Sequence, residues 1–200
     1  MRNNILFINA APRRGSRTKR LADCVLKKLG GTVNEEKIYE YIFPQATEFF
    51  LESRDSAAAH KDFSNPLFRY AKTFAEADVI VIAAPFWDMS FPAALKSYIE
   101  QINVVGITFR YSPQGAVETL CKAKALIYVT TSGGNIGKDG HIFGYGYVRW
   151  LAKSLYGIEN VMLVSAEGLD IAGADIEGIM KNAEAEAVRR TDEIIQKAGL

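Results

Sequence analysis

The chain has 200 residues, of which 48% are hydrophobic and 24% are charged, and its formal net charge is +1. These values are typical of one globular domain, and they exclude the strong positive field of a nucleic-acid-binding or membrane-binding protein. Cys24 and Cys121 form no CxxC pair, which argues against a disulfide framework or a zinc site. No apolar run resembles a signal peptide or a transmembrane helix. We therefore expect a single domain over residues 1–200, located in the cytoplasm, with no membrane or nucleic-acid partner.

The first part of the chain predicts a strand, a helix and a second strand. Residues 5–8 form a short apolar run, and the polar loop 10–18 connects it to an amphipathic helix over residues 18–29. Residues 37–43 alternate enough to predict a second strand at a sheet edge. Residues 44–65 carry a weak signal, and we expect a loop there with a broken helix near residues 49–51.

The middle of the chain contains the strongest strand signal. A helix over residues 66–77 leads into residues 79–84, an uninterrupted apolar run that predicts a strand covered on both faces. Pro85 ends this strand, and a loop with aromatic residues follows. Pro92 opens a helix that continues to residue 102, and residues 104–119 then form a long, glycine-bearing connection of the kind that is often functional.

The last part of the chain adds two strands and two helices. A fourth strand over residues 125–131 runs directly into a glycine-rich loop that extends to residue 146. A short helix over residues 147–156 and a fifth strand over residues 161–165 follow. Asp175 is the expected N-cap of a final helix that ends at residue 198.

Alternation of strands and helices predicts an α/β fold. A parallel sheet with helices on both faces, a three-layer sandwich, is the arrangement that this alternation favours. Right-handed crossovers leave few strand orders, and the order 2-1-3-4-5 suits five parallel strands. That order places a binding crevice beside the loops after the first and third strands, with the loop after the fourth strand at its border.

The loop after the first strand is a candidate phosphate site. Ser16, Arg17 and Thr18 open a helix, so free backbone N–H groups and the positive end of the helix dipole accompany two hydroxyl groups. The alternative is a simple N-cap surrounded by solvated arginines. Neither GxxxxGK[ST] nor GxGxxG is present, which excludes a nucleotide-hydrolysing P-loop and a Rossmann dinucleotide loop.

The other two loops offer an apolar wall and backbone donors. Phe86, Trp87 and Met89 would provide apolar area for a flat ring, although the two aromatic residues are equally compatible with a buried core. Gly133 and Gly134 would bring backbone N–H groups close to a ligand. A phosphate site, an apolar wall and polar backbone fit FMN better than ATP, because no metal-ligand set or triphosphate lysine is evident.

Three stretches carry a resemblance to a known family. They are DVIVIAAPFWDMSFPAALKSYIEQI, GITFRYSPQGAVETLCKAKALIYVTTSGG and GIENVMLVSAEGLD, which together cover much of the C-terminal two-thirds of the chain. The sequence resembles the FMN-dependent NADH-azoreductases, or NADH:quinone oxidoreductases, of the flavodoxin-like fold. The GITFRY segment is the most specific part of this resemblance.

The resemblance implies a homodimer with FMN, which passes hydride from NADH or NADPH to quinones, azo compounds or nitro aromatics by ping-pong kinetics. Carried over by position, a phosphate-binding segment, a ring-lining segment and a segment at the pyrimidine edge would hold the cofactor. They comprise Ser16, Arg17 and Thr18; Pro85, Phe86, Trp87, Asp88 and Met89; and Thr131, Ser132, Gly133 and Gly134, respectively.

The chain departs from the family pattern at two places in these segments. Asp88 stands where the family has asparagine, and its carboxylate would oppose the negative charge of reduced flavin, so we expect its backbone N–H to face the ring. Ala10 or Ala11 replaces a serine and removes one phosphate donor. Residues 44–65, which in the family help to shape the substrate mouth, match poorly.

Four further residues are candidates for the open face of the ring. Phe109, Tyr111 and Trp150 would line it, with core or interface aromatics as the alternative, and His141 would close over it from a glycine-rich loop. No catalytic side chain is expected, because the cofactor performs the hydride chemistry.

Three other functions share this fold. A flavodoxin-type electron carrier usually has strong negative charge, and the net charge of +1 argues against it. The other two are an NAD(P)H-dependent reductase that releases reduced FMN, and a flavin-free signalling or scaffold domain. No basic pocket for a 2′-phosphate is evident in the sequence, so the preference between NADH and NADPH stays open.

Overall fold

The computed structural model describes residues 3–200, apart from the side chain of Lys138. Its centre is a parallel sheet in the order β2-β1-β3-β6-β7. The strands are β1 (Asn4–Asn9), β2 (Thr32–Lys37), β3 (Val79–Ala83), β6 (Ala125–Thr131) and β7 (Asn160–Ala166). The predicted order 2-1-3-4-5 is confirmed, and so is the three-layer α/β sandwich of the flavodoxin-like type.

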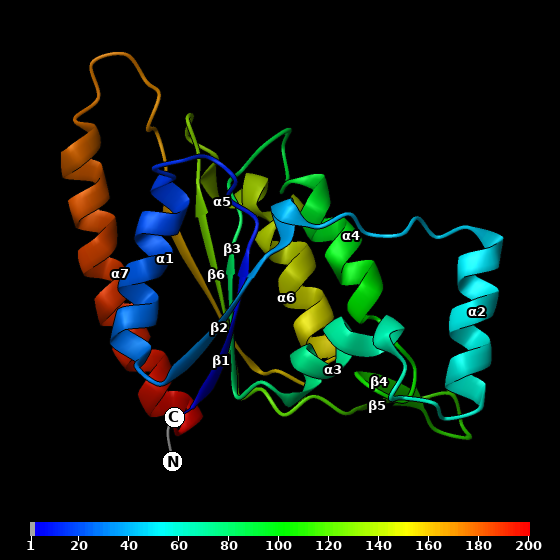
Figure 1. The fold of residues 1–200 in the computed structure, drawn as a ribbon. Helices are drawn as coiled ribbons and strands as arrows, with labels where there is room; N and C mark the ends of the chain where they lie inside the picture. The colour runs from blue at the N-terminus through cyan, green and yellow to red at the C-terminus, as the bar shows by residue number, and fades with distance from the viewer. Residues whose placement is uncertain (1–2) are drawn as a thin grey trace.

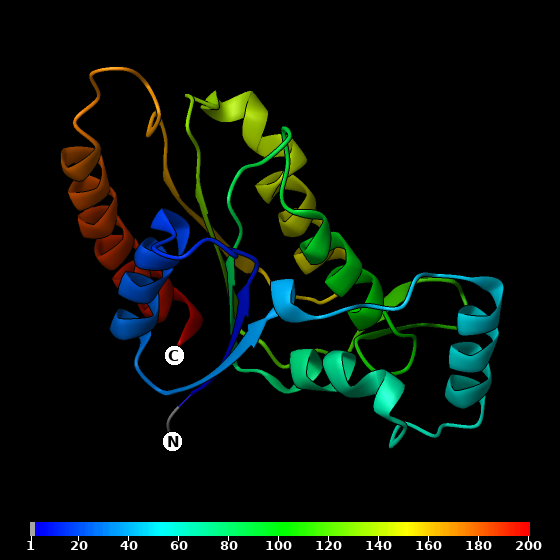
Figure 2. The same cartoon turned by 45° about the horizontal axis from the view of Figure 1, so that its top comes forward.

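Helices cover both faces of the sheet (Figure 1). They are α1 (Arg17–Leu29), α2 (Glu48–Ala59), α3 (Arg69–Glu76), α4 (Ala93–Ile102), α5 (Gly137–Gly140), α6 (Tyr145–Ser154) and α7 (Ile176–Ala198). Helices α1 and α7 lie on one face, and α3, α4 and α6 lie on the other, as the turned view in Figure 2 also shows. Among the described residues, no helix combines the length and the apolarity that crossing a bilayer requires.

Alternating side chains along the central strands build two separate cores. In β1, Ile5 and Phe7 pack with α1 and α7, whereas Leu6 and Ile8 pack with the helices of the opposite face. Every residue of β3 and β6 is buried, because each face of these strands meets a helix layer. This confirms the prediction that residues 79–84 are uniformly apolar because the strand is covered on both faces.

The predicted second strand was placed wrongly. Strand β2 spans Thr32–Lys37, where only Glu36 is buried, and residues 38–40 of the predicted strand form a 3-10 turn. The apolar side chains that suggested a strand, Tyr41 and Phe43, pack in an aromatic cluster with Tyr70. An edge strand with one polar face has no hydrophobic run to reveal it.

Two segments contain more regular structure than was expected, the first of them where only a broken helix near residues 49–51 was predicted. Helix α2 forms over Glu48–Ala59, and none of its residues is buried. It stands apart from the sheet at one side of the molecule (Figure 1). The long connection after α4 contains an antiparallel hairpin of β4 (Phe109–Tyr111) and β5 (Val117–Thr119).

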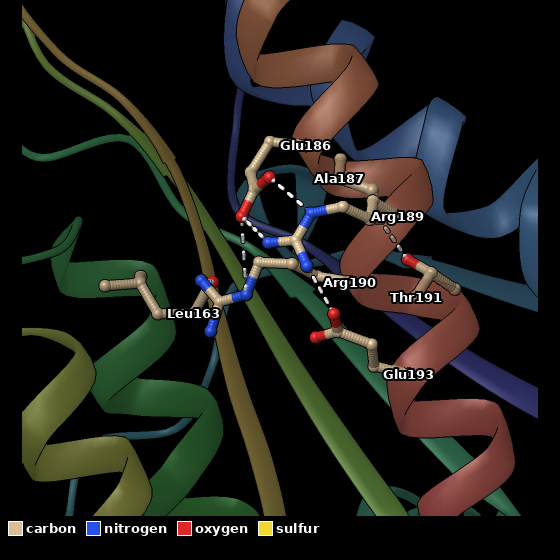
Figure 3. A network of polar contacts seen from close by, with 7 residues as sticks. All are labelled: Leu163, Glu186, Ala187, Arg189, Arg190, Thr191 and Glu193. Atoms are coloured by element: carbon tan, nitrogen blue, oxygen red, sulfur yellow. Dashed lines mark hydrogen bonds and ion pairs between the residues drawn. The ribbon is translucent and has the colours of Figure 1, made fainter.

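An arginine network fastens α7 to the edge strand β7 (Figure 3). The guanidinium of Arg190 donates to the carbonyl oxygen of Leu163 at 2.6 Å. The preceding residue of the helix, Arg189, pairs with Glu186 and Glu193. Arg190 thus satisfies one of the carbonyl groups that an edge strand leaves without a ladder partner.

Candidate functional site

Loops from the carboxyl ends of four strands surround one cavity of about 410 Å³. Nine predicted site residues line it: Ser16, Arg17, Thr18, Pro85, Phe86, Trp87, Thr131, Ser132 and Gly133. The side chains of Asp88 and Met89 are exposed and, like Gly134, do not line this cavity. Parallel strands bring their carboxyl ends to the same edge of the sheet, which explains why segments more than 100 residues apart meet here.

The start of α1 forms the first wall of the cavity. Ser16 is the N-cap, and its hydroxyl accepts from the N–H of Lys19 at 3.3 Å. The N–H groups of Arg17 and Thr18 donate to no acceptor within residues 3–200. The segment is therefore compatible both with a simple N-cap and with a phosphate site, because the capped helix leaves two N–H donors free at its positive end.

The hydroxyl of Thr18 has a structural partner. Its Oγ1 lies 2.6 Å from Oγ1 of Thr131, and Thr18 is 1% exposed. One hydroxyl donates to the other, so the acceptor of the pair still has a proton for a ligand. This contact joins the first turn of α1 to the end of β6.

The loop after β7 completes the site, and the sequence interpretation did not assign it a role. Arg17 donates to the carboxylate of Asp170 at 2.8 Å and to the carbonyl oxygen of Leu169 at 3.2 Å, and both residues line the cavity. The guanidinium of Arg17 is therefore held by the protein. A usable signal existed, because residues 167–170 follow a parallel strand at the same edge of the sheet.

The loop after β3 is a tight turn over residues 87–90. Trp87 and Ser90 exchange two backbone hydrogen bonds, of 3.1 and 2.8 Å. The two central residues, Asp88 and Met89, have φ values of 50° and 65°, the pattern of a type I′ turn. This conformation is costly for methionine, and strain of this kind is typical of functional sites.

Trp87 meets a cation at the cavity. The guanidinium carbon of Arg13 lies 5.2 Å from the centre of the indole ring, within the range of a cation–π contact. Ser90, at the other end of the turn, donates to the carbonyl oxygen of Phe143 at 2.7 Å. The turn is thereby held between the loop after β1 and the segment after α5.

The loop after β6 is joined to the loop after β7 by backbone hydrogen bonds. Leu169 and Asp170 donate to the carbonyl oxygens of Ser132 and Gly133, at 3.1 and 2.9 Å. A Cβ at Gly133 would collide with the Asp170 carboxylate, whereas one at Gly134 would meet nothing. The N–H groups of Gly133 and Gly134 have no acceptor in the described part of the chain.

His141 anchors the glycine-rich segment and does not face the cavity. Its Nε2 lies 2.7 Å from one carboxylate oxygen of Glu167, and the other oxygen accepts from the N–H groups of Ile136 and Gly137 at 2.7 and 3.2 Å. Burial opposes ionisation of Glu167, but these hydrogen bonds prevail and lower its pKa.

Three other predicted lining residues lie away from the cavity within one chain. Phe109 and Tyr111 belong to the β4–β5 hairpin near the amino ends of the central strands, the opposite end of the sheet (Figure 1). Trp150 is 65% exposed on α6, where it lines a second cavity of about 620 Å³. The alternation of strands and helices in the sequence does not indicate to which end of the sheet the β4–β5 hairpin extends, so the sequence could not place Phe109 and Tyr111.

Comparisons with known proteins agree with this architecture. Residues 3–191 match a family model described as the flavodoxin-like fold. An FMN-dependent NADH:quinone oxidoreductase 2 of Clostridium acetobutylicum is 35% identical over 200 residues, covering 96% of this chain and 99% of that protein. The corresponding oxidoreductase of Coprothermobacter proteolyticus is 35% identical, covering 92% and 95% of the two chains.

Solved structures share the fold at lower identity. An azoreductase from Bacillus anthracis str. Sterne has a TM-score of 0.81 at 23% identity, covering 96% of this chain and 99% of that one. An FMN-dependent NADH-azoreductase from B. anthracis str. Ames Ancestor, solved in complex with FMN, has a TM-score of 0.73 at 21% identity, covering 96% and 99%. Full-length identity above 30% and the family match lead to one conclusion: the chain belongs to the flavodoxin-like fold family, among the FMN-dependent NADH:quinone oxidoreductases.

Proposed function

We propose that this protein is an FMN-dependent oxidoreductase that uses NADH to reduce quinones and azo compounds. One observation carries the proposal: unpaired N–H donors from two elements and an aromatic wall surround the same cavity. The family relationship supports this activity, because the relatives are named for FMN, NADH and quinone. We extend the proposal to nitro aromatics as further acceptors and to NADPH as an alternative hydride donor.

The residues present fit FMN. The cavity volume lies within the range of about 300–1,000 Å³ that is usual for cofactor sites. The free N–H groups of Arg17 and Thr18 suit the phosphate, and Phe86 and Trp87 suit one face or edge of the ring. The free N–H group of Gly133, which lines the cavity, suits the pyrimidine edge.

The protein's contribution to the reaction is to bind and to orient. FMN supplies the hydride chemistry when bound. The N–H donor of Gly133 lies at the cavity and would stabilise negative charge at the pyrimidine edge of a bound flavin, and the hydrogen bonds from Leu169 and Asp170 keep this loop in place. Asp88 is exposed and does not line the cavity, which limits repulsion between its carboxylate and that charge.

The working unit that we propose is a homodimer. The second cavity lies beside the turn at residues 87–90, and its lining includes Phe91, Phe143, Tyr147 and Trp150. Phe143 and Trp150 are 64% and 65% exposed, and large exposed side chains in one apolar patch are typical of a protein interface.

The competing functions differ in simple measurements. An electron carrier would bind FMN but would not consume NADH rapidly when a quinone is present. A reductase that supplies free reduced flavin would lose FMN on gel filtration and would turn over added FMN. A flavin-free domain would be colourless and would take up no FMN.

The test uses purified protein. We expect a yellow protein with a flavin spectrum, an apparent mass of two chains in light scattering, and NADH-dependent reduction of a quinone and an azo dye with parallel double-reciprocal lines. A colourless protein that does not bind added FMN would refute the proposal. A monomer with full activity would refute only the dimer.

A further inference from the structure

A further cavity, of about 700 Å³, shares the loop at residues 11–16 with the cofactor cavity. Its other wall comes from the end of β2 and the 3-10 turn after it, with Lys37 and Glu40. We call this space the basic groove. Its lining includes Ser16, the N-cap of α1, so the groove borders the free N–H donors that suit the phosphate of FMN.

Positive charge is concentrated in the basic groove. Five cationic side chains line it against two carboxylates. The cations belong to Arg13, Arg14, Lys19, Arg20 and Lys37, and the carboxylates belong to Asp23 and Glu40. The whole chain has a formal net charge of only +1, so this excess is local. An excess of one charge in a concave surface raises the local concentration of the opposite ion and the rate at which it arrives.

Three of these cations are not neutralised by a close carboxylate. Within residues 3–200, Arg14 pairs with no carboxylate, and Arg13 contacts the ring of Trp87 but no acidic group. Lys37 has only Glu40 near it, at 3.9 Å. The two cations on α1, in contrast, pair with carboxylates at 2.5 to 2.9 Å. The field of the groove therefore comes mainly from the loop at residues 11–16 and the end of β2.

The phosphate is the group of FMN on which this field acts. It carries about 1.5 to 2 negative charges at pH 7, whereas the oxidised ring and the ribityl chain are neutral. Attraction by the groove therefore turns the phosphate toward the loop at residues 11–16 while the cofactor approaches. Lys37 and Glu40 do not line the cofactor cavity, so they act on the approaching cofactor and not by contact with the seated one.

We propose that the basic groove is an encounter site that attracts the phosphate of FMN and raises the rate at which the cofactor enters its cavity. The inference rests on the proposed function and deepens it, because it assigns cofactor loading to residues outside the cavity. A charge at the rim of a binding site changes the association rate and its dependence on salt, with little effect on dissociation. The association rate of FMN therefore follows the charge of the groove in both directions.

The first experiment changes the charge of the groove. Dilution of the FMN-loaded protein gives the dissociation rate constant from the recovery of flavin fluorescence and Kd from its final level, and their ratio gives the association rate constant. At about 10 mM salt, where the Debye length is about 30 Å, we expect Lys37→Gln to slow association about two- to threefold. Glu40→Gln should accelerate association by a similar factor, and neither variant should change dissociation by more than about 1.5-fold.

Each groove variant has a matched control with the same change of net charge. Lys27→Gln removes an exposed cation from the last turn of α1, roughly 16 Å along the helix from Ser16. Glu76→Gln removes an exposed carboxylate at the end of α3, next to the amino end of β3 and so at the opposite edge of the sheet. Both controls should stay within about 1.5-fold of wild type. A groove variant and its control that change association equally would overturn the proposal, because net charge alone would then be the cause.

The second experiment raises the salt concentration. At about 1 M salt the Debye length falls to about 3 Å, so wild type and both groove variants should associate with FMN at the same rate. A difference that persists at high salt overturns the proposal. A change that appears in dissociation in place of association also overturns it, because Lys37 or Glu40 would then act on the seated cofactor.

These outcomes are separable from a failure of the proposed function. Wild-type protein that binds FMN and oxidises NADH, but whose FMN association does not respond to the charge of the groove, contradicts only the groove. Protein that takes up no flavin contradicts the proposed function, and the groove with it.

Discussion

Two parts of the same site are held in opposite ways. The loop after β6 is joined to the loop after β7 by backbone hydrogen bonds, and its start is tied to α1 through the Thr18–Thr131 hydroxyl pair. The backbone of the turn at residues 87–90 instead closes on itself, with two side-chain-bearing residues at positive φ, and the contacts that hold the turn from outside come from side chains. The first part is positioned by its neighbours, whereas the second carries local strain that its surroundings must support.

This contrast bears on which part tolerates change. Because the loop after β6 is hydrogen-bonded to the loop after β7, a substitution in one loop also displaces the other. We therefore expect such substitutions to reduce both the free energy of unfolding and cofactor binding. A self-contained turn with strain can gain stability when the strain is relieved. The four predictions below test this difference, from the largest expected effect to the smallest.

The largest effect is expected for Gly133→Ala. Its Cβ would lie within 3.1 Å of three side-chain atoms of Asp170, so the Asp170 side chain must move and its contact with Arg17 is disturbed. We expect a loss of about 2–3 kcal/mol in the free energy of unfolding, with weaker FMN retention. Gly134→Ala is the control, since its Cβ meets open space, and urea unfolding together with FMN titration measures both variants. Equal stability of the two variants would contradict the model of a cross-linked loop.

The second effect concerns Thr131→Val. The substitution leaves the buried hydroxyl of Thr18 without its partner at 2.6 Å, which should cost about 1–3 kcal/mol of stability. The neighbouring Thr130→Val is the matched control, because the buried Oγ1 of Thr130 has no hydrogen-bond partner in the described structure. We expect that control to be neutral or slightly stabilising, so a Tm that falls equally in both variants would count against the hydroxyl pair.

A third prediction uses pH to weaken the hydrogen bonds that the Glu167 carboxylate makes with His141 and with the N–H groups of Ile136 and Gly137. The folded-state pKa of Glu167 is lowered below the usual value of 4.5, so its stabilisation is present above that value and is lost as the pH falls through the folded pKa. We expect Glu167→Gln to cost about 1 kcal/mol at pH 7. The difference from wild type should disappear as the pH falls well below 4.5. Thermal melts at several pH values measure it, and a difference that persists in acid would rule out ionisation as the cause.

The smallest effect has the opposite sign. Met89→Gly relieves the cost of a side chain at a φ of 65°, and part of this gain is offset by the greater entropy of glycine in the unfolded chain. We expect a net gain of about 0.5–1 kcal/mol, whereas Met89→Ala, which retains a Cβ, should gain none. Chemical denaturation distinguishes the two variants, and a destabilised glycine variant would show that Met89 stabilises the turn through contacts instead.

The sequence by itself determined the layers of the fold and most of the segments that line the candidate site. Runs such as residues 79–84 and 125–131 are apolar because helices cover both sheet faces, so their composition reveals strand and sheet type together. Strand ends at Pro85 and Thr131 and the helix start at Ser16 then locate the three loops. The strand order brings these loops to one edge, and the handedness of the crossovers restricts that order to a few possibilities.

Only the tertiary structure decided the features that depend on contacts between distant residues. Strand β2 is identified by pairing with β1, since its own side chains are almost all exposed. Arg17 meets Asp170 across 153 positions, and Phe109 lies at the far end of the sheet because a hairpin turns there. Local patterns record which side chains a segment buries, whereas polar partners and the direction of a loop depend on what the rest of the chain places beside it.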